Sequence, residues 1–135
     1  MLTRANDVAS AVLGLGAPVT AWIAHDGDRK PQVDMRAWTS APEPPAWRAD
    51  ADDLEDLDGL RFLHRTFSWM PGALDEELKL CADDRLAALT VFSAALGHAC
   101  CPYDGGIDVF GRSPALVQSI RTLFPAWIST HPAGL

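Results

Sequence analysis

The hydrophobic pattern at the start of the chain predicts a short helix followed by a hairpin. Residues 4–13 predict the helix, which Gly14 ends. The β-branched and aromatic residues of 19–25 predict a strand. A turn at Asp26-Gly27-Asp28 then leads to a return strand at 33–38, so we expect a hairpin over residues 19–38.

Two further helices follow from the pattern in the second half of the chain. Apolar residues recur at near-helical spacing over residues 74–97, which predicts a helix that ends at Gly97. Asp83-Asp84 is a point at which this helix could divide in two, and Cys81 falls on its apolar face as a core thiol. Ser113-Pro114, a capping residue followed by proline at the first helical position, starts a helix over residues 114–124.

The segment between these regions supports two interpretations. Residues 50–58 hold six acidic side chains in nine positions, and Asp52 and Glu55 have the spacing of a capping box. Acidic residues favour a helix N-terminus, so the pattern favours a helix over residues 52–69. Gly59 weakens that helix by about 1 kcal/mol, and a strand at 60–67 is the alternative.

Most residues that could do chemistry lie in residues 98–110, which predict a tight hairpin. Asp104-Gly105 is a typical centre for a type I′ turn, and it pairs Cys101 with Asp108 and Cys100 with Val109. Side chains alternate between the faces of a strand, so Cys100, Pro102, Ile107 and Val109 share the core side. We expect Cys101, Tyr103 and Asp108 on the other face, with Ala99 and Phe110.

This register argues against an activated cysteine. A nucleophilic thiol needs a lowered pKa, which positive charge or a helix N-terminus supplies. Cys101 instead faces the carboxylate of Asp108, and burial in apolar surroundings raises the pKa of Cys100. The adjacent cysteines point to opposite faces, so they do not form a zinc site with His98. We therefore expect no catalytic residue, no metal and no cofactor.

Composition and charge set the class of protein. The 135 residues are 48% hydrophobic and 21% charged, which suits one domain over residues 1–135. The net charge of −7 argues against a nucleic-acid partner. Three cysteines and the lack of a signal peptide or spanning segment predict a cytoplasmic protein that does not enter a membrane. Five tryptophans suit either core packing or anchors at an interface.

Together these elements predict an α+β fold in a single domain. We expect a small antiparallel sheet, built from the hairpins at 19–38 and 98–110. Three to four helices pack on it, with 74–97 and 114–124 the principal ones.

Three stretches of the chain carry a resemblance to known proteins. They are Arg-Leu-Ala-Ala-Leu-Thr-Val-Phe at 85–92, Tyr-Asp-Gly-Gly-Ile-Asp-Val-Phe at 103–110 and Phe-Pro-Ala-Trp-Ile at 124–128. This C-terminal part resembles small uncharacterised bacterial domains, some of which are encoded beside polymorphic toxins as immunity proteins. The resemblance implies a cytoplasmic antitoxin that inhibits a toxin by binding it.

Size, acidity and the lack of a catalytic constellation are compatible with a binding module whose partner is a protein, for example a basic toxin domain. The residues expected to touch that partner are Asp50, Asp52, Asp53, Glu55, Asp56, Asp58, Tyr103 and Asp108. The alternative is a small enzyme, or an accessory to one, with a pocket near the 98–110 hairpin. That pocket would be lined by Tyr103, Asp108, Cys101 or His98.

Overall fold

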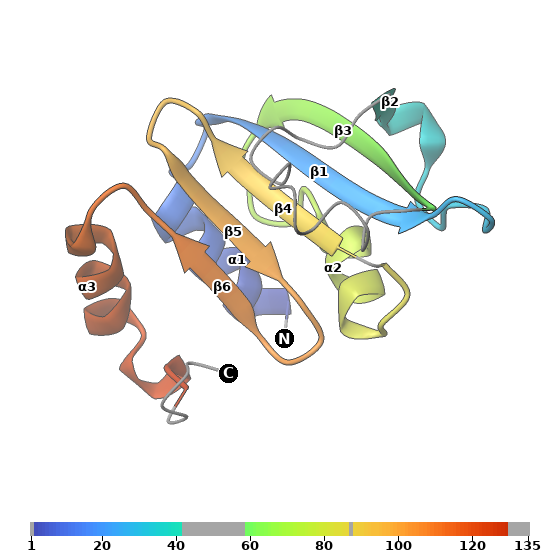
Figure 1. Ribbon diagram of the computed structural model, residues 1–135. Coiled ribbons are helices and arrows are strands. Elements are labelled where there is room, and N and C mark those ends of the chain that lie inside the picture. The colour runs from blue at the N-terminus through green and yellow to red at the C-terminus, as the bar shows by residue number, and fades with distance from the viewer. Residues whose placement is uncertain (1, 42–58, 87, 130–135) are drawn as a thin grey trace.

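The computed structural model describes residues 2–41, 59–86 and 88–129 (Figure 1). These residues form one α+β domain with a six-stranded antiparallel sheet, in the order β2-β3-β1-β4-β5-β6, and three α-helices. The strands are β1 (Pro18–Asp26), β2 (Thr39–Ala41), β3 (Leu60–Ser68), β4 (Ala88–Ser93), β5 (His98–Pro102) and β6 (Ile107–Phe110). The helices are α1 (Leu2–Leu13), α2 (Asp75–Ala82) and α3 (Pro114–Leu123), with short 3₁₀ helices η1 (Met35–Ala37) and η3 (Pro125–Trp127). The predicted fold class is confirmed, as are the helices expected at 4–13 and 114–124.

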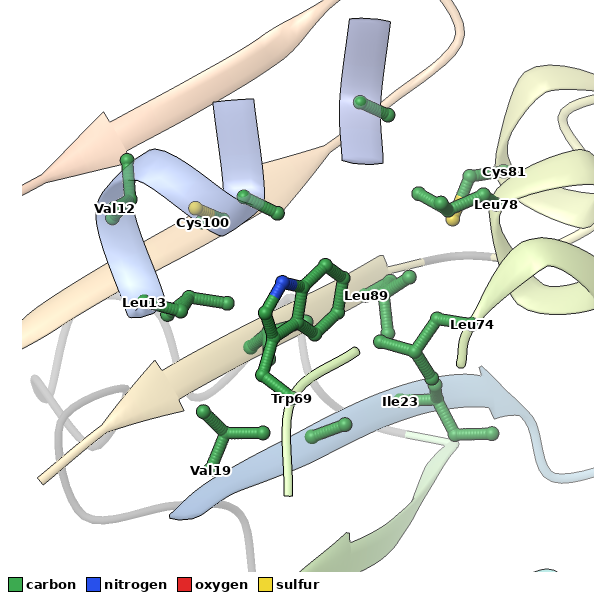
Figure 2. Close-up of a cluster of buried hydrophobic side chains, with 14 of the residues drawn as sticks. Val12, Leu13, Val19, Ile23, Trp69, Leu74, Leu78, Cys81, Leu89 and Cys100 are labelled. Carbon is green, nitrogen blue, oxygen red and sulfur yellow. The ribbon is translucent and has the colours of Figure 1, made fainter. Parts of the chain in front are cut away.

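The core lies between the sheet and the helices α1 and α2, which cover the same face of the sheet (Figure 1). We call this face the inner face and the opposite one the outer face. On the central strand β1, the inner-face residues Val19, Ala21 and Ile23 are buried. Figure 2 shows the indole ring of Trp69 in the middle of this core, between α1 and the sheet. Its Nε1 donates a hydrogen bond to Oγ of Ser10, 3.1 Å away.

Arg65 and Glu77 form a charged pair on the inner face of the sheet, beside β3. The guanidinium of Arg65 lies 3.8 Å from Oε1 of Glu77 on α2, and it donates a hydrogen bond of 2.6 Å to the carbonyl of Ala73. Its central carbon lies 5.0 Å from the ring centroid of Trp38 and 4.8 Å from that of Phe67. Nε1 of Trp38 donates to the same carboxylate oxygen of Glu77 at 3.2 Å. These contacts join Trp38, the residue that follows η1, to β3 and α2.

Residues 60–68 form a strand, so the helix favoured over 52–69 is wrong and the alternative strand is confirmed. β3 pairs with β1 along its whole length, from Pro18 opposite Ser68 to Asp26 opposite Leu60. This tertiary pairing outweighs the acidic residues that favoured a helix, because a charge at a helix end typically contributes only about 0.3–1 kcal/mol. The acidic start of the predicted helix, at 50–58, lies outside the described residues.

The helix predicted over 74–97 is also wrong in its second half. α2 ends at Ala82, and Asp84 just beyond it adopts a positive φ of 52°. The chain then forms β4, which lies between β1 and β5 near the middle of the sheet. Both faces of β4 are covered at Leu89, Thr90 and Val91, which are all buried. A strand buried on both sides has a continuous apolar pattern, and periodicity does not distinguish such a pattern from a buried helix.

The return strand expected at 33–38 is wrong. The chain there forms η1, whose start is capped by the carboxylate of Asp34, which accepts a hydrogen bond from the backbone N–H of Arg36. The strand that follows, β2, pairs with β3 and not with β1. β1 has β3 and β4 as its neighbours, so the hairpin predicted over 19–38 does not exist.

Candidate functional site

The outer face of the sheet carries a row of cross-strand neighbours from one edge to the other. The strand register and the contact between Thr90 and Cys101 define this row, which we call the outer row. Its members are Thr39, His64, Trp22, Thr90, Cys101 and Asp108. Thr90 in this row is buried, Trp22, His64 and Cys101 are half-buried, and Thr39 and Asp108 are exposed. The outer row is the place to look for a site, because it holds most of the chemically active side chains of the sheet.

An aromatic stack occupies the β1 and β3 part of the outer row. The rings of Trp22 and His64 are stacked, with centroids 5.0 Å apart and an angle of 30° between the planes. Both side chains are half-buried. In the neighbouring row, the hydroxyls of Thr20 and Thr66 lie 3.0 Å apart and form a hydrogen bond. The stack and this bond fix the side chains across β1 and β3, so this part of the face is a pre-formed surface.

The hairpin of β5 and β6 ends the outer row, and the structure confirms its predicted register. Cys101 faces Asp108, and Cys100 faces Val109. Tyr103 and Gly106 exchange two backbone hydrogen bonds, of 3.0 and 3.4 Å, around a two-residue turn. The expectation of a type I′ turn is wrong, because neither central residue has the positive φ which that turn requires.

Tyr103 and Asp108 lie together on the outer face, as predicted. The Tyr103 ring lies over the turn, because a Cβ built at Gly106 would come within 3.0 Å of the tyrosine hydroxyl. Partial burial raises the pKa of Tyr103, and the carboxylates of Asp108 and Asp104 raise it further. The end of the hairpin thus combines a neutral aromatic hydroxyl with negative charge.

The groups that an enzyme would need are divided between the two faces. His98 lies on the inner face, where its Nδ1 donates a hydrogen bond of 2.9 Å to the carbonyl of Val12 in α1. Cys101 lies on the outer face, with Sγ 3.4 Å from Oγ1 of Thr90. The structure therefore brings Cys101, Tyr103 and Asp108 to one face and leaves His98 on the other.

Two of the three thiols are buried in the core and held in their neutral form. Burial raises the pKa of Cys100, which is 1% exposed, and burial also raises the pKa of Cys81, to about 12. His64 is three strands from Cys101, about 14 Å at ordinary strand spacing, with Trp22 between them. Among the described residues, no group of three potential ligands could hold a metal ion.

The sequence did not identify the aromatic part of this site. Trp22 could have been placed from strand alternation, since it lies between the buried residues Ala21 and Ile23. His64 could not, because a helix was favoured over its segment. The other predicted partner-binding residues, Asp50, Asp52, Asp53, Glu55, Asp56 and Asp58, lie outside the described residues, as does Trp47.

Comparison with known proteins adds a family to this geometry. Within the described part of the chain, no helix has the length and apolar character needed to cross a membrane. Neither a curated protein nor a solved structure matches the chain. A family model described as a domain of unknown function, DUF3885, matches residues 1–132, which extends well beyond the C-terminal region that carried the resemblance. The chain belongs to the DUF3885 family.

Proposed function

We propose that this protein is a binding module that acts by protein–protein contact, most concretely as an immunity-type inhibitor of a bacterial toxin. The observation that carries the proposal is the composition of the outer face. It holds an ordered aromatic stack, an exposed Phe110 and the pair of Tyr103 and Asp108. Aromatic residues that are held rigidly and surrounded by polar groups are typical anchors of protein interfaces.

The chemistry of the same face supports binding over catalysis. The reactive groups of the hairpin are split between faces, and burial holds two of the three thiols in their neutral form. A protein that inhibits by contact needs shape and charge, and it needs no activated group.

The acidic segment at 50–58 forms the second part of the proposal. Its six carboxylates lie in a chain with a net charge of −7, and they would attract a basic partner. Such charge mainly speeds association and selects the partner, and salt screens it. We infer that the segment steers the partner and that the outer face holds it.

The experiment uses the protein encoded immediately upstream of this one. Both proteins are produced together and separately in bacteria, and growth and complex formation are measured. We expect the upstream protein to slow growth and this protein to restore it through a complex of the two. If no complex forms and growth is not restored, the immunity function is wrong.

A charge-reversal variant tests the acidic segment in the same assay. Changing Asp52, Asp53, Glu55 and Asp56 to lysine should lower the association rate at low salt, and the difference from wild type should shrink as salt is added. A variant that associates like wild type at every salt concentration contradicts the steering role. The matched control reverses four exposed carboxylates elsewhere on the surface, those of Asp7, Asp28, Glu76 and Asp83.

A further inference from the structure

The strand β6 is the last strand of the sheet, and within residues 2–41, 59–86 and 88–129 no strand pairs with its outer edge. In the strand order β6 pairs with β5 alone, and no described strand lies beyond it. The helix that follows, α3, packs chiefly on α1. Figure 1 shows β6 as the border of the sheet on the side where α3 lies. A free edge presents main-chain donors and acceptors that another extended segment can pair with.

The hairpin register identifies which groups point outward. Tyr103 and Gly106 form a hydrogen-bonded pair. Because such pairs alternate along an antiparallel ladder, Cys101 and Asp108 form the next one, and Ile107 and Val109 direct their N–H and C=O groups away from β5. Two donors and two acceptors therefore line the outer edge at alternate positions.

The side chains of β6 give this edge two different faces. Ile107 and Val109 are half-buried and pack against the core on the inner face. Asp108 is exposed on the outer face, and Phe110 beside it is 56% exposed. A strand added here would place apolar residues opposite Ile107 and Val109 and would bring the residue between them next to the carboxylate of Asp108.

Charge distinguishes the possible occupants of this edge. If a second copy of β6 paired Ile107 with Val109, the two copies of Asp108 would lie directly opposite each other. Like charges at directly opposed positions destabilise a ladder. A segment with lysine or arginine at the central position instead forms an opposite-charge pair with Asp108, beside a tyrosine that also faces this carboxylate.

We propose that β6 receives an extended segment of a partner protein by strand addition, with a basic residue opposite Asp108 and apolar residues opposite Ile107 and Val109. This inference rests on the proposed function, because it specifies how the protein partner is held. Main-chain hydrogen bonds supply the affinity, and the alternating side chains supply the selectivity.

A synthetic peptide tests the edge directly, without a natural partner. The probe is acetyl-Thr-Val-Lys-Val-Thr-amide, and the control replaces its lysine with glutamate. Each is titrated to about 1 mM into ¹⁵N-labelled full-length protein, a range suited to weak complexes. We expect saturable shifts on β6 and slower amide exchange at Ile107 and Val109 with the lysine peptide only. Shifts elsewhere, no shifts, or equal binding of the glutamate peptide would overturn the proposal.

A pair of variants then separates the edge from the rest of the surface. Val109→Pro removes an outward N–H without removing a hydrogen bond to β5, although it also fixes φ and shortens a side chain that packs on the core. Val109→Thr keeps the N–H and serves as the control. Ile107→Pro is the second variant if Val109→Pro does not fold. We expect Val109→Pro to weaken binding of the lysine peptide and of the upstream protein at least tenfold. If the upstream protein binds wild type and Val109→Pro with equal affinity, strand addition at β6 is wrong. The proposed function as a binding module is then unaffected. If the lysine peptide pairs with β6 but the upstream protein binds neither wild type nor any variant, the immunity function is wrong. The assignment of β6 as an edge that accepts a strand is then still supported. A homodimer that Val109→Pro dissociates would assign the edge to a second copy and overturn the proposal.

Discussion

Two tryptophans on opposite faces of the sheet should respond very differently to replacement by alanine. Trp69 is 1% exposed and fills the centre of the core (Figure 2). Burying about 250 Å² of indole surface at about 25 cal/mol per Å² gives an upper limit near 6 kcal/mol. Replacements of buried aromatic residues by alanine cost about 3–5 kcal/mol, because the cavity collapses only in part. We therefore expect Trp69→Ala to lower the free energy of unfolding by about 4 kcal/mol.

Trp22 is half-buried and stacks on His64 at the outer face. Its removal opens a surface depression instead of a sealed cavity, so Trp22→Ala should cost only about 1–2 kcal/mol. The assay is urea unfolding followed by far-UV circular dichroism on wild type and both variants. Equal losses for the two variants, or a loss below about 1 kcal/mol for Trp69→Ala, would refute the assignment of inner and outer faces. Ser10→Ala removes the hydroxyl that accepts the hydrogen bond of the indole and should cost about 1–2 kcal/mol.

Three further predictions follow from single side chains. A maleimide reagent should modify Cys101 in the native protein well before Cys100, and mass spectrometry of peptides measures both rates. Equal rates of modification would contradict the assignment of the two thiols to opposite faces. Ultraviolet titration of Tyr103, the only tyrosine of the chain, should give a pKa above the ordinary value of about 10. The substitution Asp108→Asn should lower the pKa of Tyr103. An unchanged pKa would show that the carboxylate of Asp108 does not act on the phenol. Glu77→Ala leaves the guanidinium of Arg65 inside the fold without its carboxylate and should cost about 3 kcal/mol in urea unfolding; a cost below about 1 kcal/mol would show that solvent already screens the pair.

The hairpin at 98–110 could be predicted from sequence because its determinants are local. The Asp104-Gly105 turn sets which residues face each other, and strand alternation then places Cys100 in the core and Cys101 outside. The turn type was wrong even so, because a two-residue loop keeps the same register in several backbone conformations.

The centre of the sheet could not be predicted in the same way. β3 and β4 form through pairing with β1, to which they are distant in sequence. Their local patterns resembled helices, since acidic residues precede β3 and a continuous apolar run makes up β4. The stack of Trp22 on His64 depends on the pairing of β1 with β3, so it could not be found before that pairing was known.

The affinity of the upstream protein for wild type and for Trp22→Ala is the most direct test of the outer face as a binding surface. Calorimetry measures both dissociation constants, with Leu15→Ser as the control, since Leu15 is an exposed apolar residue in the loop between α1 and β1. We expect Trp22→Ala to keep its fold and to bind roughly 30-fold more weakly, the effect of losing an interface anchor worth about 2 kcal/mol. Leu15→Ser should bind as wild type does. If a folded Trp22→Ala variant binds as tightly as wild type, the outer face is not the binding surface.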